Sequence, residues 1–262
     1  MCGRYVLRQD PTALAAQMGI RQPTLGERLA AYEPNYNVAP TDEVVAVLER
    51  PERGAAGAQA GAVRDLHAVR WGLIPSWTTV PVGAQGGVRS VGAKMINARI
   101  ETAAEKPSFR TAFRKRRCIL PADGYYEWYR PMTHKQQKQP YFIHDPSGRA
   151  LAFAGMYELW RDPAVEDRDD PVAWLWTATI LTTTSVGSLS RIHDRMPVLV
   201  PRANFDMWLD PDFGSGPGDV EALRGMLDSD RDPELAAYAV STAVNSVRND
   251  GPALIEAVAV EP

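Results

Sequence analysis

Hydrophobic residues along this chain recur mostly with the two-residue period of β-strands. Alternating or continuous apolar runs predict strands at residues 4–8, 43–48, 140–144, 151–159, 173–183, 196–200 and 237–244. Another strand opens at Ala68 and breaks at Pro75, and residues 117–128 predict a strand that is interrupted at 121–124. The chain contains no internal repeat, so these strands belong to one continuous fold and not to a repeat array.

Helical segments are fewer and shorter. Asp10 followed by Pro11 is typical of a helix start, and this helix is expected to run to about Met18. Further helices are predicted at residues 100–106, at 205–209 and from Asp219 to about Leu227. Strands outnumber helices and show no regular βαβ rhythm. The predicted fold class is therefore α+β, with a mainly antiparallel, partly barrel-like sheet and peripheral helices.

Composition is consistent with one domain over residues 1–262. Of these residues 45% are hydrophobic and 23% are charged, as in a soluble globular protein. Three stretches rich in glycine, alanine or polar residues predict surface insertions near 51–62, 82–92 and 161–170. No apolar run approaches the roughly 20 residues of a membrane span, and no secretory signal opens the chain. We expect a cytoplasmic monomer without membrane contact, associated with the nucleoid if the host is bacterial.

Two cysteines, Cys2 and Cys118, form neither a disulfide framework nor a CxxC metal motif. Cys118 lies among apolar residues and is expected to be buried and inert. The sequence therefore predicts a reducing compartment, no metal and no cofactor.

Charge is divided unevenly between the two halves of the chain. The net charge of −3 argues against nucleic acid, but residues 1–149 carry +8 and residues 150–262 carry −11. Such asymmetry indicates an anionic partner for the first half, although acidic loops that keep the second half soluble would give the same pattern.

The first residues offer the clearest chemistry. Initiator methionine is normally removed before a small residue, and its removal would leave Cys2 with a free α-amine and a thiol. Their reference pKa values are about 8 and about 8.5, so a useful fraction of each is nucleophilic at neutral pH. An amine and an adjacent thiol capture an aldehyde as an imine that closes to a thiazolidine. The alternative is an ordinary second residue on a frayed terminus.

Four other side chains occupy unusual settings. Glu127 follows two tyrosines and precedes Trp128, where burial would raise its pKa, although a salt-bridged strand residue would look the same. His193 lies between arginines and beside Asp194, which suits proton transfer as well as a structural histidine. Asn97 is placed as a helix cap or a site amide. An exposed Trp77, two residues after Pro75, would stack on a base instead of joining the core.

Several segments resemble the SRAP (SOS-response-associated peptidase) family, in the family's order and over nearly the whole chain. They are MCGRY at 1–5, YNVAP at 36–40, WGLIPSW at 71–77, NARIET at 97–102, RCILPADGYYEW at 117–128, IHDRMP at 192–197, and VS followed by VNSVRNDGP within 240–252. The stretches at 51–62 and 82–92 look like insertions beyond a compact family member.

The resemblance implies a sensor of abasic sites in single-stranded DNA, or at a junction of single and double strands, that shields the lesion as a covalent cross-link. By that likeness Cys2 is the nucleophile, Asn97 orients its amine, and Glu127 assists ring opening and the imine stage. His193 matches the acid/base residue of ring opening and of reversal. The residues that match DNA contacts are Arg4, Asn37, Pro40, Trp77 and Arg99.

Three functions therefore compete at this point. The leading one is a DNA cross-linking enzyme with weak lyase or reversal activity. The second is a cysteine peptidase in which Cys2 acts with His193 and Glu127. The third is a non-covalent single-strand-binding module with an incidental cysteine. In the leading function the basic run Arg114–Arg117 would track phosphates together with Arg4 and Arg99, although a solvated surface would show the same run.

Overall fold

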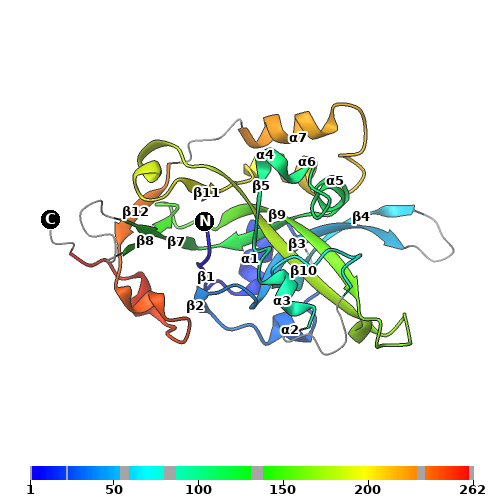
Figure 1. The fold of residues 1–262 in the computed structure, drawn as a ribbon, viewed down its shortest axis with the longest axis horizontal. Helices are drawn as coiled ribbons and strands as arrows, with labels where there is room; N and C mark the ends of the chain where they lie inside the picture. The colour runs from blue at the N-terminus through cyan, green and yellow to red at the C-terminus, as the bar shows by residue number, and fades with distance from the viewer. Residues whose placement is uncertain are drawn as a thin grey trace.

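The computed structural model describes residues 2–21, 23–53, 59–79, 87–130, 138–228 and 234–259, and shows two β-sheets with short helices around them (Figure 1). The smaller sheet has the order β12-β8-β7-β1-β2 and all its pairs are antiparallel. Its strands are β12 (Ala236–Ala239), β8 (Gln139–His144), β7 (Gly124–Tyr129), β1 (Tyr5–Leu7) and β2 (Asn35–Val38).

The larger sheet closes on itself. Its order is β11-β10-β4-β3-β6-β9, and β10 also pairs with β9, so five strands form a ring. The parallel pairs are those of β10 with β4 and with the short β5, and the mainly antiparallel, partly barrel-like α+β fold is confirmed. The strands are β3 (Glu43–Arg53), β4 (Gln59–Trp71), β5 (Asn97–Arg99), β6 (Arg117–Ala122), β9 (Leu151–Arg161), β10 (Trp174–Thr184) and β11 (Arg195–Pro197).

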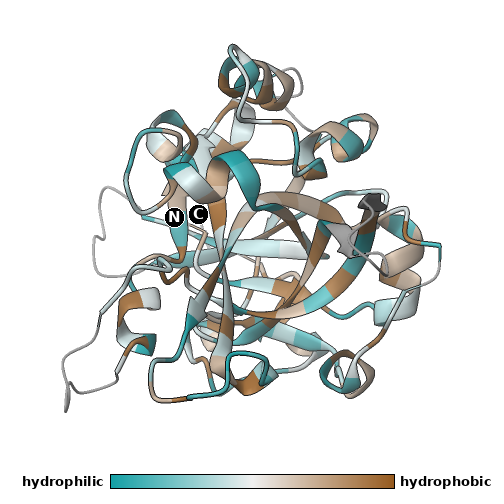
Figure 2. Cartoon of the chain, turned by 90° about the vertical axis from the view of Figure 1, so that its right-hand side faces the viewer, coloured by the Kyte–Doolittle hydropathy of each residue, from teal (hydrophilic) through white to brown (hydrophobic). Residues whose placement is uncertain are grey.

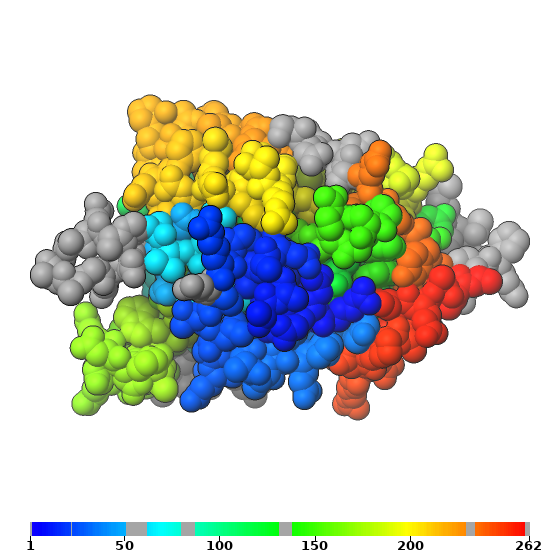
Figure 3. Space-filling view, turned by 180° about the vertical axis from the view of Figure 1, so that it is seen from behind, coloured from blue at the N-terminus to red at the C-terminus, as the bar shows by residue number. Residues whose placement is uncertain are grey.

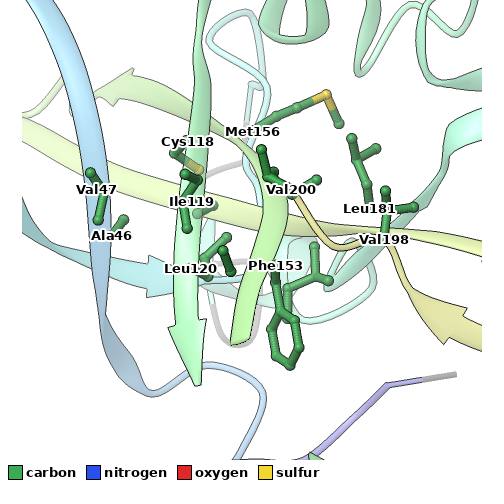
Figure 4. Close-up of a cluster of buried hydrophobic side chains, with 14 of the residues drawn as sticks. Ala46, Val47, Cys118, Ile119, Leu120, Phe153, Met156, Leu181, Val198 and Val200 are labelled. Atoms are coloured by element: carbon green, nitrogen blue, oxygen red, sulfur yellow. The ribbon is translucent and has the colours of Figure 1, made fainter. Parts of the chain in front are cut away.

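The ring encloses the main hydrophobic core. Figure 4 shows side chains from β3, β6, β9 and β10 meeting there, among them Ile119, Phe153 and Leu181, all fully buried. Figure 2 shows hydrophobic stretches along the strands that cross the middle of the molecule, and β6 and β9 are buried over most of their length. Cys118 is buried in this core and burial raises its thiol pKa, which suits the expected inert residue.

Helices cover the edges of the sheets. Figure 1 shows α4 to α7 along one side of the molecule and α2 and α3 on the opposite side. Within the described residues, none is long and apolar enough to cross a membrane. The α-helices are α1 (Pro11–Gln17), α2 (Glu27–Ala30), α3 (Arg89–Gly92), α4 (Ile100–Ala103), α5 (Arg110–Lys115), α6 (Phe205–Leu209) and α7 (Asp219–Asp228). Short 3-10 turns are η2 (Pro171–Ala173), η3 (Gly187–Arg191), η4 (Arg202–Asn204), η5 (Thr242–Asn245) and η6 (Pro252–Ile255).

Two of the predicted surface insertions contain regular structure where they are described. The stretch 51–62 is largely strand, because β3 and β4 pair as far as Arg53 and Gln59, and residues 54–58 lie outside the described part. The stretch 82–92 ends in α3, while residues 82–86 are not described. Residues 162–170 form the expected loop between β9 and β10.

One predicted strand was too long. The expected strand at 237–244 ends at Ala239, and residues 242–245 turn into η5. Ser241 caps this turn, since its hydroxyl accepts from the backbone N–H of Ala243 at 3.2 Å. A polar side chain that bonds its own backbone offers the chain an alternative to the sheet ladder.

Two glycines allow the backbone after β4 to cross α3 closely. Gly72 has φ +126°, and a Cβ on it would lie 2.5 Å from the carbonyl oxygen of Gly92. A Cβ on Gly92 would lie 2.4 Å from the oxygen of Gly72. No larger residue fits at either position without backbone movement, so the Trp77 turn and α3 are held at a fixed separation.

Candidate active site around Cys2

Strand β1 carries Cys2 to the candidate site. Tyr5 lies opposite Tyr125 in the antiparallel β1–β7 pair, and Tyr126 donates its backbone N–H to the carbonyl of Arg4 at 3.0 Å. Continuing this register by one residue places Gly3 beside Glu127. Cys2 therefore lies next to the Glu127 carboxyl, and Figure 1 marks the N-terminus near the middle of the view.

Cys2 is fully buried, and its thiol is neutral in this arrangement. Burial raises the pKa of the thiol well above its usual value, and the Glu127 carboxylate raises it further. Met1 lies outside the described residues.

Asn97 holds the backbone of Cys2. Its Nδ2 donates to the carbonyl oxygen of Cys2 at 2.7 Å, across 95 residues of sequence. The Asn97 Oδ1 is buried and has no hydrogen-bond partner within the described residues. The side chain is thus fixed at one end and keeps an acceptor at the other. Since Asn97 opens β5, it was correctly placed before a helix, but it does not cap that helix.

Glu127 is a buried carboxyl group facing a histidine. Only 2% of it is exposed, and burial raises its pKa to about 7, with the nearby Asp194 carboxylate adding to the shift. Its Oε2 lies 3.9 Å from Nε2 of His193. This separation is longer than a hydrogen bond, but catalytic contacts often tighten only when substrate binds.

His193 is oriented by the chain that follows it. Its Nδ1 accepts from the backbone N–H of Arg195 at 3.0 Å and also lies 3.0 Å from Oδ1 of the Asp194 carboxylate, while Nε2 faces Glu127. Burial lowers its pKa, which favours the neutral form at physiological pH. The imidazole can therefore exchange a proton with the Glu127 carboxyl.

Arg195 is a positioning residue that the sequence reasoning did not single out. Its guanidinium bonds both carboxylate oxygens of Glu101, at 2.7 and 3.0 Å, and also contacts Thr182. Burial and this geometry fix the turn that carries His193. The signal was present, since Arg195 stands two residues after His193, but its carboxylate partner is 94 residues distant in sequence.

Arg4 and Asn37 bind the protein itself. Arg4 donates to Asn37 Oδ1 at 2.7 Å and to the carbonyl of Val244 at 2.8 Å. The Asn37 Nδ2 donates to the carbonyls of Ser246 and Asn249 at 2.9 and 2.8 Å. Asn37 is 3% exposed, so its amide holds the C-terminal loop in place. Figure 3 shows the corresponding neighbourhood, with the N-terminal part in blue beside the C-terminal segment in red.

Three other predicted DNA contacts lie at the surface. Arg99 is exposed at the end of β5, two residues after Asn97, and Trp77 is 65% exposed. Pro40 is half-buried and precedes Thr41, whose φ of 81° is unusual for a β-branched residue. A hydrogen bond of 2.9 Å from the Thr41 N–H to the Trp71 carbonyl holds this turn.

The basic run 114–117 does not form the expected phosphate groove. Arg117 is 2% exposed and donates to five backbone carbonyls, and burial lowers its pKa to about 10. Arg116 pairs with Glu158 at 2.7 Å. Only Arg114 and Lys115 are exposed, on α5. The expectation was wrong because two of the four cations stabilise the protein interior.

Cys2, Asn97, Glu127 and His193 thus come together from four separate segments, whereas Arg4 and Asn37 form a structural clamp beside them. Within the described part of the chain, no three histidine, cysteine or acidic side chains are grouped to hold a metal ion.

Comparison with known proteins places this fold and site. Residues 1–247 match the family described as SOS response associated peptidase (SRAP). The chain is 38% identical over 256 residues to the abasic site processing protein YoqW of Bacillus subtilis, covering 98% of this chain and 99% of that protein. It is 30% identical to the abasic site processing protein HMCES of Xenopus tropicalis, covering 87% and 67% of the two chains.

A solved structure has the same fold. A protein from Bacteroides thetaiotaomicron superposes with a TM-score of 0.72 at 23% identity and covers 98% of this chain and all of that one. The fold and site define a mixed α+β protein in which a cysteine near the amino end meets a buried carboxyl and a histidine. The chain belongs to the SRAP family.

Proposed function

We propose that this protein processes abasic sites in single-stranded DNA by capturing the open sugar as a thiazolidine on Cys2. The observation that carries the proposal is the convergence of Cys2, Asn97 and Glu127, with Asn97 bonded to the Cys2 carbonyl at 2.7 Å. Family membership and the names of the relatives, which are abasic site processing proteins, support the choice of substrate. This activity is a DNA-repair function.

Capture follows from the two nucleophiles of a processed Cys2. Removal of Met1 frees the α-amine, whose nitrogen forms a bond to C1′ of the aldehyde while the oxygen takes up protons and leaves as water. The thiol then adds across the resulting C=N bond, so that sulfur joins C1′ and its proton moves to nitrogen. The sum is one aldehyde and one aminothiol giving one thiazolidine and one water.

The carboxyl of Glu127 suits both proton transfers in this sequence. With a pKa of about 7 it holds a proton in half of the molecules at neutral pH, and can give that proton to the departing oxygen. Its ionised form can then accept the thiol proton, whose pKa burial has raised. His193, 3.9 Å away, returns or removes the Glu127 proton and so also serves the reverse reaction.

The free Oδ1 of Asn97 is placed to accept from the α-amine and to direct its lone pair at the sugar. Arg99 and Trp77, both exposed, supply a phosphate contact and a stacking surface. Arg4 and Asn37 contribute indirectly to DNA binding, because they hold in place the loop around residues 244–249.

The test is a denaturing gel of an abasic oligonucleotide incubated with processed, Met1-retaining and Cys2→Ala protein. Processed protein is expected to give a heat-stable adduct without borohydride. Met1-retaining protein should give none, because its amine is an amide, while an imine from Cys2→Ala should appear only after borohydride trapping. A stable adduct from the Met1-retaining form, with Met1 confirmed by intact mass, would sink the proposal and favour a thiol that acts alone, as in a peptidase.

A further inference from the structure

A pocket of about 430 Å³ lies between α3 and the arms of the β9–β10 hairpin, outside the site of Cys2. Its volume is in the range of small-molecule sites. The side chains that give it its character are Arg70, Arg89, Trp160, Trp174, Leu175 and Trp176. Indole rings and guanidinium groups in one cavity are the groups that recognise bases and phosphates.

The two arginines are not bonded to a carboxylate in the described part of the chain, although the nearby Asp42 charge partly offsets that of Arg70. Within the described residues neither Arg70 nor Arg89 forms an ion pair, and the Arg70 Nε is buried with no hydrogen-bond partner there. Burial lowers the pKa of Arg70, and the nearby charge of Arg89 lowers it further. Electrostatic repulsion between two like charges raises the free energy of the pocket, and a bound anion would relieve this repulsion.

The acidic residues at the rim have partners of their own. Glu43 pairs with Arg28 at 2.7 Å, and Asp162 accepts from the backbone N–H of Ala164 at 2.9 Å. Arg70 and Arg89 are therefore the cations left to receive an anion, with the carboxylates of Asp42 and Asp162 nearby.

Trp160 and Trp174 are fixed by hydrogen bonds, but Trp160 is buried and Trp176 is stacked on His67 and Tyr157, so the open ring is that of Trp174. The Trp160 Nε1 donates to the Thr78 carbonyl and the Trp174 Nε1 to the Arg168 carbonyl, both at 2.9 Å. Trp174 nevertheless stays 37% exposed. An indole with a satisfied N–H and an exposed ring offers a stacking surface without further hydrogen-bond requirements.

The pocket lies within reach of a strand bound at Cys2. Asn97, which holds Cys2, pairs with Ile180 of β10, and Trp174 lies six residues earlier on that strand, or about 20 Å at about 3.3 Å per residue. Stacked nucleotides about 3.4 Å apart span this in about six steps, and a more extended strand spans it in fewer. Trp77 adjoins Thr78, the partner of Trp160, and so connects the two places.

We propose that this pocket is a subsite for a nucleotide of the single strand about three to six positions from the abasic site, with its base on Trp174 and its phosphate at Arg70 and Arg89. This rests on the proposed function, because the strand is taken to be anchored at Cys2. The subsite makes affinity depend on the length of one flank of the lesion.

The experiment uses fluorescence anisotropy with oligonucleotides that contain tetrahydrofuran, an abasic analogue without an aldehyde, so that binding is measured without cross-linking. One flank is lengthened from one to eight nucleotides while the other stays short, first 5′ and then 3′. Wild-type protein is expected to show a step in affinity on one flank between about three and seven nucleotides, about tenfold in size. Arg70→Gln combined with Trp174→Ala should abolish the step.

Arg110→Ala is the charge-matched control, since Arg110 is exposed at the start of α5 and should keep the step. Arg89→Ala, also at an exposed residue, replaces the double variant if thermal melting shows that the latter does not fold. A smooth affinity curve on both flanks, or a step that persists in the variants, would overturn the subsite. The adduct assay with wild-type protein and a short abasic oligonucleotide decides the proposed function separately.

Discussion

The chemistry of Glu127 depends on where its side chain is buried. Three aromatic neighbours in sequence predicted burial, and the structure shows 2% exposure with a pKa of about 7. The sequence could not show the partners, because Cys2 and His193 are more than 60 residues away on either side. Sequence reasoning therefore predicts which residue has an unusual environment, while contacts across the sheets determine what it acts on.

Glu127→Gln is expected to change how stability depends on pH. The folded-state pKa lies above the usual 4.5, so the carboxyl stabilises the fold relative to the unfolded chain below about pH 4.5 and loses this contribution as pH rises to about 7. Across that window the free energy of unfolding of the wild type should fall relative to the glutamine variant by on the order of 3 kcal/mol. Urea unfolding of both proteins at several pH values measures this. If the free energies of unfolding of the wild type and the glutamine variant changed equally with pH, the raised pKa would be contradicted.

His193→Ala should slow release of the adduct at least as much as its formation, each by about a hundredfold, since the lost group serves proton transfer in both directions. Release is measured as transfer of a labelled abasic strand to excess unlabelled strand. Affinity for the tetrahydrofuran strand should stay near that of the wild type. A parallel loss of that affinity would mean that His193 binds DNA instead of moving protons.

Elements with their own local signals were predicted well. Asp10 caps α1 as expected, and α6 spans the predicted 205–209. Helix α5 was missed because its Arg-Thr-Ala-Phe-Arg-Lys sequence has little apolar periodicity, and it is stabilised by packing of Ala112 and Phe113 in the core. Strand β2 was not predicted, since its pairing with β1 comes from distant contacts.

Gly92→Ala tests the close crossing of α3 and the segment after β4. The new Cβ would lie 2.4 Å from a backbone oxygen, so the elements must separate at a cost of about 1–3 kcal/mol, and Tm should fall by several degrees. Gly225→Ala in α7 is the control, because nothing lies within 4 Å of its Cβ. That change should leave Tm equal or higher, by up to about 1 kcal/mol in stability. Equal changes in Tm for the two variants would show that the crossing accommodates the added Cβ at position 92 without strain.

At the scale of the whole molecule, the charge division between the halves of the chain has two origins. Part of the positive charge is used inside, in Arg117 and in the Arg116–Glu158 pair. Part is exposed, as in Arg99 beside the candidate site. Counting charges along the sequence could not separate these uses.

Affinity for single strands should therefore fall with salt at a slope of a few units, about −0.7 for each phosphate contacted. Arg99→Ala should reduce the slope by about 0.7, whereas Arg110→Ala should leave it unchanged. The measurement is a salt titration of anisotropy with an unmodified oligonucleotide. A wild-type slope near zero over a tenfold range of salt would show that the protein does not bind the strand through its phosphates.

The position of Cys2 in the fold also sets an order of events during synthesis. With Met1 as the initiator, as the proposed chemistry requires, Cys2 emerges early from the ribosome, but the strand that pairs beside it ends at Tyr129 and the histidine that completes its site is residue 193. At about 5–20 residues per second these parts appear roughly 10–40 s later. During that interval the amino end is an accessible, unfolded tail, and afterwards Cys2 is fully buried. The methionine excision that the proposed chemistry requires therefore has its window before the rest of the protein has been made.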